Sequence, residues 1–372
     1  MRHLLAKFKK YFVLSNYSNV TKKLNILMSK TPGRSVISRR GMTGNSTFTK
    51  PLVGIVSQHF IDQAGVDILA KCCPSATFVL IEYTGVSLKQ LKDLDILIAD
   101  PAHVCKYIFN LPKLRWMQST FAGVNPIVDQ LQQDTPPPTF VLTRLGGVFG
   151  PPMAEYVIGH IIARERKFSL SRKYQQDKTW GSWKKFIHRP LSELTIGILG
   201  FGDIGKEIAK YCKSMKMTVN IVHRTVPATK SSFVDESFSI EELPKFLQQC
   251  DYICNVLPST PSTRGLLSGN ILENCKEKKT VLINIGRGDV ISCDSILNAL
   301  NNQWIGGAIL DVFKEEPLPN DSELWTHPQV TITPHIAGLT RKNQVIDSFK
   351  ENFELFKEGK PMKYVVDWSK GY

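Results

Sequence analysis

The chain has 372 residues, of which 42% are apolar and 22% are charged, and its formal net charge at pH 7 is +14. This length and composition are typical of a globular protein with two domains, each large enough to have its own core. Charged residues interrupt every apolar run before it reaches the roughly 20 residues that a membrane-spanning helix needs, which excludes a membrane span.

Most of the positive charge lies at the N-terminus. Residues 1–50 contain 11 of the 47 Lys and Arg residues and none of the 33 Asp and Glu residues, so the remainder has 36 basic against 33 acidic residues, or +3. Because this remainder is nearly neutral, we expect no nucleic-acid partner. The basic, Ser-rich segment is typical of a mitochondrial presequence. The alternative is a disordered tail on a cytoplasmic protein, and in both cases we exclude residues 1–50 from the fold, with Met42 as an alternative start.

From residue 51 onwards, apolar β-rich runs alternate with helical patterns, which predicts an α/β fold with βαβ units and parallel sheets. The predicted strands form two groups. The first group consists of residues 51–56, 77–82, 95–100, 115–119 and 139–144. The second group consists of residues 194–200, 217–223, 250–257, 280–285, 306–312 and 330–335.

Two helical patterns bear on how the domains are connected. Residues 151–174 begin with proline and carry apolar side chains at helical spacing, so they predict a helix that bridges two domains. Residues 341–359 form another helical pattern after the last strand. We therefore expect the C-terminus to return to the first domain.

Eight cysteines occur in the chain, without a C-x-x-C motif or a Cys/His cluster at zinc spacing. Most lie in apolar surroundings, where a free cysteine packs as a small hydrophobic residue. The sequence therefore predicts reduced thiols and no metal site.

The segment TIGILGFGDIGKEIAKYCKSM contains Gly200, Gly202 and Gly205 in the spacing G-x-G-x-x-G. It follows an apolar strand and opens a helical pattern, which is the context in which this spacing indicates a dinucleotide site. Gly200 allows a tight turn, Gly202 lets the backbone approach a diphosphate, and Gly205 lets helix and strand pack closely. The sequence therefore predicts a nicotinamide dinucleotide as cofactor.

The next strand indicates which dinucleotide is preferred. An NAD site usually has an acidic residue about 20 positions on, to bind the ribose 2′-hydroxyl. Here the strand ends in His223, Arg224 and Thr225, and no Asp or Glu occurs between Glu207 and Asp235. A charge-assisted hydrogen bond from Arg224 to a 2′-phosphate contributes about 1.5–3 kcal/mol, which predicts a preference of about 10- to 100-fold for NADPH over NADH. The alternative is that Arg224 is a solvated surface residue.

Three further strand ends carry Arg287, Glu316 and His335. Reduction of a 2-oxo acid needs a cation for the carboxylate and an acid for the carbonyl oxygen. The planar guanidinium of Arg287 suits the first role, and His335 suits the second because its charge changes near neutral pH. Glu316 would orient the imidazole and raise its pKa. Taken singly, Arg287 could instead lie in a turn between Gly286 and Gly288 with unusual backbone angles, Glu316 could be a surface carboxylate, and His335 a core histidine.

The glycine motif followed by NIGRGD, DVFKEEP and TPHIAG, in this order and at these distances, resembles the D-isomer-specific 2-hydroxyacid dehydrogenases from about residue 51 to the C-terminus. The resemblance implies that Arg287 binds the substrate carboxylate and that His335, paired with Glu316, is the general acid in reduction. It also implies that Gly123 and Val124, in the loop 119–125, hold the carboxylate through their amides. The flanking glycines of Arg287 are expected to let the backbone pass close to nicotinamide and substrate.

The same resemblance implies a domain organisation and further contacts. It predicts two doubly wound parallel-sheet domains, with a Rossmann nucleotide-binding domain (153–336) inserted in a flavodoxin-like substrate domain (51–152 plus 337–372). A homodimer through the nucleotide domain is expected. Further cofactor contacts are expected from Phe201, Asp203, Ile204, Leu257, Pro258, Ile285 and Asp311.

Within the family, LPSTPSTRGLL, residues 311–335 and the terminal GY are similar to the glyoxylate and hydroxypyruvate reductases. The resemblance implies an NADPH-preferring reductase of these acids to glycolate and D-glycerate. Asn125 stands where many members have Asp. The segment HIAGLT differs from the commoner HIGS or HIAS pattern. Two alternatives stay open: a reductase of another 2-oxo acid such as pyruvate, and a non-enzymatic, nucleotide-gated scaffold of the corepressor type.

Overall fold

The computed structural model describes residues 50–58, 63–131, 138–223 and 231–371, all within one compact unit, Thr49–Tyr372. The predicted N-terminal segment lies outside the described residues apart from Lys50, and so do Arg224 and Thr225. No helix among the described residues has both the length and the apolar character needed to cross a membrane.

The first sheet has five parallel strands in the order β2-β1-β3-β4-β5, which is the flavodoxin-like order. Strands such as β3, whose residues ILIA are all buried, are apolar throughout because helices cover both faces of a parallel sheet. The strands are β1 (Leu52–Val56), β2 (Thr77–Leu80), β3 (Ile96–Ala99), β4 (Trp116–Ser119) and β5 (Val141–Thr143). The helices between them are α1 (Gln63–Cys72), α2 (Leu88–Leu91), α3 (Pro101–Val104) and α4 (Asn125–Val128).

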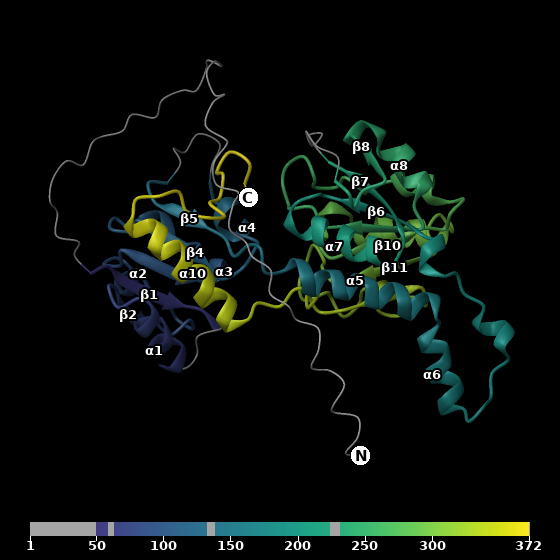
Figure 1. Ribbon diagram of the computed structural model, residues 1–372, viewed down its shortest axis with the longest axis horizontal. Helices are drawn as coiled ribbons and strands as arrows, with labels where there is room; N and C mark the ends of the chain where they lie inside the picture. The colour runs from purple at the N-terminus through teal and green to yellow at the C-terminus, as the bar shows by residue number, and fades with distance from the viewer. Residues whose placement is uncertain (1–49, 59–62, 132–137, 224–230, 372) are drawn as a thin grey trace, which may run out of the picture. The chain divides into compact units, whose positions relative to one another are not determined.

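The C-terminal helix α10 (Lys342–Lys357) packs on this first sheet (Figure 1). Its Phe349 is fully buried and stacks on Trp116 of β4, with 4.9 Å between the ring centroids. Beyond the helix, Val365 pairs in antiparallel fashion with Thr143 at the end of β5. The chain therefore leaves the first sheet after β5 and returns to it after the second sheet is complete.

The second sheet has seven parallel strands in the order β12-β11-β10-β9-β6-β7-β8. Counted in chain order from β6, the first six strands are arranged 3-2-1-4-5-6, as in a Rossmann fold. The strands are β6 (Thr195–Leu199), β7 (Thr218–Val222), β8 (Glu236–Phe238), β9 (Tyr252–Asn255), β10 (Val281–Asn284), β11 (Gly307–Leu310) and β12 (Val330–Ile332). The helices are α7 (Asp203–Ser214), α8 (Leu243–Gln249) and α9 (Cys293–Asn301). Two parallel sheets with alternating helices confirm the predicted fold class.

Two details differ from the sequence prediction. The short edge strand β8 was not predicted, because its three residues ESF show neither an apolar run nor alternation. The single helix predicted over 151–174 is two helices, α5 (Gly150–Glu165) and α6 (Phe168–Gln176). Lys167 between them has a φ of 53°, a left-handed conformation that an L-residue cannot continue as a helix.

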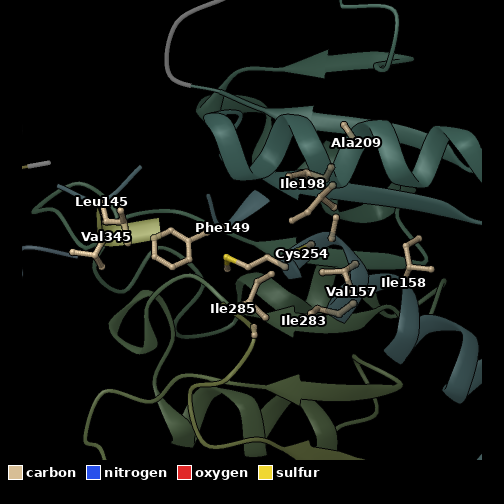
Figure 2. Close-up of a cluster of buried hydrophobic side chains, with 14 of the residues drawn as sticks. Leu145, Phe149, Val157, Ile158, Ile198, Ala209, Cys254, Ile283, Ile285 and Val345 are labelled. Carbon is tan, nitrogen blue, oxygen red and sulfur yellow. The ribbon is translucent and has the colours of Figure 1, made fainter. Parts of the chain in front are cut away.

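One cluster of buried apolar side chains contains residues from both sheets. Phe149, just before α5, lies between Leu145 and Val345 on one side and Cys254 and Ile285 on the other (Figure 2). A packed apolar core therefore joins the two sheets.

All eight cysteines lie in the described part of the chain, and each is a free thiol. Burial raises the pKa of Cys212 to about 12, so this thiol stays protonated and packs as an apolar group. Within the described residues, no group of three or more His, Cys, Asp or Glu side chains is arranged to hold a metal ion.

Candidate active site

A cavity of about 830 Å³ lies at the carboxyl ends of the strands of both sheets. Open α/β sheets bind ligands at this edge, near the point where the strand order reverses. Thirteen of the predicted site residues line it: Gly123, Gly200, Phe201, Gly202, Asp203, Ile204, His223, Leu257, Pro258, Ile285, Arg287, Asp311 and His335. Three described site residues do not line it: Val124, whose side chain is buried, Gly205 and Glu316.

The glycine-rich loop after β6 has the geometry of a dinucleotide site. Gly200 has a φ of +101°, which permits the tight turn out of the strand. A side chain on Gly205 would collide with the carbonyl oxygen of Gly200, so only glycine lets α7 pack this closely on the loop. Gly202 has open space where a side chain would be, and α7 begins at Asp203 with its amides directed to the cavity edge. These residues fit the diphosphate of a bound dinucleotide.

His223 follows β7 and lines the same cavity. Both of its ring nitrogens are buried and have no hydrogen-bond partner among the described residues. Buried polar atoms are normally paired, so unpaired ring nitrogens at a cavity are suited to a ligand. Arg224 and Thr225, the other two residues predicted to contact the cofactor here, lie outside the described residues.

Arg287 follows β10, and its flanking glycines lie in close contact with neighbouring backbone. Gly286 and Gly288 do not have positive φ angles, so the alternative of a turn with unusual backbone angles is wrong. A side chain on Gly286 would meet the backbone of Leu257, and one on Gly288 would collide with the backbone of Phe313. The glycines thus let neighbouring strand-end loops pack together, and this packing directs Arg287 into the cavity.

The guanidinium of Arg287 is held by neutral groups. Its Nη1 donates to the carbonyl oxygen of Gly286 at 2.7 Å, and its Nε donates to Oδ1 of Asn125 at 3.3 Å. Burial lowers the pKa of Arg287, against the opposing effect of the Asp289 and Glu316 carboxylates, but a guanidinium stays charged in proteins. A positioned cation with neutral partners is suited to bind an anionic ligand.

His335 and Glu316 form a hydrogen-bonded pair. Nδ1 of His335 lies 2.8 Å from Oε2 of Glu316, whose Oε1 accepts from the amide of Phe313 at 2.8 Å. This arrangement fixes the imidazole and leaves Nε2 for a substrate. His335 lines the cavity and Glu316 stands behind it, so the carboxylate acts through the histidine.

The pair shifts both pKa values in the direction that favours the charged forms. The hydrogen bond to Glu316 raises the pKa of His335, although burial and the charge of Arg287 oppose this. Burial on its own raises the pKa of Glu316, but the hydrogen bonds from His335 and Phe313 outweigh it and hold that pKa below its usual value. The site therefore favours an imidazolium next to a carboxylate.

Asp311 organises the loop that carries His335. Its carboxylate is buried and accepts hydrogen bonds from the Thr333 hydroxyl at 2.5 Å and from the amides of Ile336 and Ala337 at 2.8 and 2.9 Å. The amide of His335 donates to the Asp311 carbonyl at 2.9 Å. Asp311 lines the cavity, and its carboxylate contacts hold the loop that carries His335.

The loop before α4 brings Gly123 against Arg287. A side chain on Gly123 would collide with Nη2 of Arg287, so the guanidinium lies directly on this glycine. Among the described residues, the amides of Gly123 and Val124 have no hydrogen-bond partner, which leaves them available to a ligand. The side chain of Val124 is buried in the core of the first sheet.

Several polar residues at the cavity were not among the predicted site residues, and two of them bear on the bound anion. Asn125 bridges the sheets, because its Oδ1 accepts from Arg287 while its Nδ2 donates to the carbonyl oxygen of Ser259 at 3.3 Å. Arg144, directly after β5, lines the cavity as a second fixed cation. The only sequence signal for Asn125 was the departure from Asp, and a single arginine at a strand end gave no signal for Arg144.

Replacing Gly123 with Ala should raise the KM for the 2-oxo acid that the sequence predicts as substrate. The added methyl group displaces the guanidinium of Arg287, and overpacking of this kind costs about 1–3 kcal/mol, equivalent to about 10- to 100-fold. Steady-state kinetics with saturating NADPH measures the effect. Gly159→Ala is the matched control, because a side chain there meets no atom within 4 Å. An unchanged KM in Gly123→Ala would contradict the contact between this loop and Arg287.

Comparisons with known proteins agree with this geometry. The family model described as D-isomer specific 2-hydroxyacid dehydrogenase, NAD binding domain, matches residues 158–337. A D-isomer specific 2-hydroxyacid dehydrogenase family protein from Aeromonas salmonicida has a similar structure, with 33% identity, a TM-score of 0.76, and coverage of 86% of this chain and 99% of that one.

Two further solved structures contain a dinucleotide. A probable 2-hydroxyacid dehydrogenase from Rhizobium etli, in complex with NADP, HEPES and L(+)-tartaric acid, has 25% identity, a TM-score of 0.72, and coverage of 87% of this chain and 99% of that one. An NADPH-dependent glyoxylate/hydroxypyruvate reductase from Sinorhizobium meliloti, in complex with NADP and sulfate, has 25% identity, a TM-score of 0.74, and coverage of 87% and 100%.

Proposed function

This chain belongs to the D-isomer specific 2-hydroxyacid dehydrogenase family, and on that premise we propose that it is an NADPH-preferring reductase of small 2-oxo acids. The proposed substrates are glyoxylate and hydroxypyruvate, and the products are glycolate and D-glycerate. One observation carries the proposal: Arg287 and the His335–Glu316 pair meet in the cavity that also contains the glycine-rich loop.

Each residue has a role that its geometry supports. A bound nicotinamide dinucleotide supplies the hydride chemistry. Arg287 binds the substrate carboxylate and orients the carbonyl group, with the free amides of Gly123 and Val124 on the opposite side. His335, held through Nδ1 by Glu316, donates a proton from Nε2 to the carbonyl oxygen as negative charge develops there.

The choice of substrate rests on similarity. The motifs LPSTPSTRGLL and 311–335 are similar to glyoxylate and hydroxypyruvate reductases, and a structure with that name is 25% identical to this chain. A reductase of pyruvate or another 2-oxo acid would use the same residues. A corepressor-type scaffold would bind the dinucleotide without turnover.

Initial rates of NADPH oxidation with glyoxylate, hydroxypyruvate and pyruvate test the proposal. We expect turnover with the first two acids to be faster than with pyruvate. Fastest turnover with pyruvate would replace the substrate assignment while keeping the reaction. Binding of NADPH without turnover of any 2-oxo acid would overturn the reductase and favour the scaffold.

The preference for NADPH is tested at Arg224. Replacing Arg224 with Ala should raise the Kd of NADPH about 10- to 100-fold, because a charge-assisted hydrogen bond to the 2′-phosphate is lost. The Kd of NADH, which lacks this phosphate, should not change. Titration of the nicotinamide fluorescence measures both constants, and an equal loss for NADPH and NADH would contradict the predicted pocket.

We also propose a homodimer. The arm formed by α6 and the residues after it exposes large apolar side chains, including a fully exposed Trp180, and α6 has no buried residue. Exposed apolar surface of this kind is typical of protein interfaces. The mitochondrial location stays a prediction from residues 1–50.

A further inference from the structure

Arg144 is placed at the cavity by the C-terminal segment. Val365 pairs with Thr143 at the end of β5, and the next amide, that of Arg144, donates to the carbonyl oxygen of Tyr364 at 3.0 Å. The guanidinium of Arg144 lies over the ring of Tyr364, with its central carbon 5.3 Å from the ring centroid. This cation–π contact holds the side chain where it lines the cavity.

Tyr364 connects Arg144 to the glycine-rich loop of the second sheet. Its ring lies against Gly146 and Gly147, where any side chain would collide with it. Burial, together with the nearby carboxylate of Asp203, the first residue of α7, raises the pKa of Tyr364. The guanidinium of Arg144 therefore lies near the start of α7.

The charges that line the cavity have distinct positions. Among its described lining residues, the two fixed cations are Arg144 and Arg287, and the two carboxylates are Asp203 and Asp311. Arg287 is held by Asn125, and the carboxylate of Asp311 is occupied by the loop that carries His335. Asp203 lies where a diphosphate would meet the helix N-terminus, so the bound anion needs a compensating cation.

We propose that Arg144 binds the diphosphate of the cofactor from the first sheet, with the ring of Tyr364 holding the guanidinium in place. The diphosphate would then be bound from two sides, by the amides of the glycine-rich loop and by Arg144. This proposal rests on the dinucleotide cofactor of the family, and it does not depend on which oxo acid is reduced.

Binding measurements with three nucleotides test the proposal in the full chain. NADPH and 2′-phospho-ADP-ribose both contain the diphosphate, whereas adenosine 2′-monophosphate lacks it. Replacing Arg144 with Ala should raise the Kd of the first two about 10- to 100-fold and leave that of adenosine 2′-monophosphate unchanged. Calorimetry measures all three constants without turnover, so a failed reductase assay does not affect the result.

Arg115→Ala is the matched control, because Arg115 stacks on Phe356 at 4.8 Å in a similar cation–π contact and does not line the cavity. It should leave all three Kd values unchanged. If Arg144→Ala does not fold, as judged by its thermal unfolding, Arg144→Gln makes the same test with a longer polar side chain. An unchanged Kd for NADPH, or an equal loss for adenosine 2′-monophosphate, would overturn the proposal.

Discussion

Replacing Arg287 with Ala should lower kcat/KM for glyoxylate about 10²- to 10³-fold, the usual effect of removing one group that stabilises the developing charge. The guanidinium lies on Gly123 and is held by Asn125 and Gly286, so no other described cation takes its place at this end of the cavity. Arg287→Lys should recover only part of the loss, because an ammonium group cannot form two parallel hydrogen bonds to a carboxylate. Steady-state kinetics at saturating NADPH measures these values.

Two controls separate this effect from damage to the fold or to the cofactor site. The Kd of NADPH should change little in Arg287→Ala, because the glycine-rich loop and its neighbours are intact. Added guanidinium ion should restore part of the turnover by occupying the space that the side chain leaves. Wild-type kcat/KM in Arg287→Ala would show that the carboxylate is bound elsewhere.

The catalytic residues that could be predicted from the sequence share one property: each follows an apolar strand of a parallel sheet. Arg287 and His335 could be predicted in this way, because the carboxyl ends of parallel strands meet at one edge. The close packing that requires glycine on both sides of Arg287 could not be predicted. It depends on Leu257 and Phe313, whose backbones approach only once the strand order is known.

Contacts between distant segments explain the remaining omissions. Arg144 reaches the cavity because Tyr364, more than 200 residues later, packs beside it, and no local pattern indicates such a pair. Asn125 and Arg287 are similarly joined only in the folded chain. The break between α5 and α6 was missed because the apolar spacing continues weakly past Lys167, whose backbone conformation the pattern does not encode.

The His335–Glu316 pair determines the expected pH dependence. Reduction needs protonated His335, so kcat/KM is highest below the pKa of His335 and falls as the pH rises through it. The carboxylate of Glu316 raises this pKa, whereas the charge of Arg287 lowers it and that of Asp311 raises it. Removing the Glu316 charge should therefore move the alkaline limb of the profile to lower pH.

Glu316→Gln makes this change while keeping a side chain of the same size. We expect reduced kcat/KM near pH 7 to 8, with part of the loss recovered in more acidic buffer, because the imidazole loses the anion that stabilises its charged form. His335→Asn should lose about 10²- to 10⁴-fold at every pH, since it removes the proton donor itself. Glu315→Gln is the matched control, because this exposed neighbour does not contact His335. An alkaline limb that stays in place or moves to higher pH in Glu316→Gln would contradict the role of the carboxylate, because a histidine that keeps its pKa without Glu316 must be held in its charged form by another group.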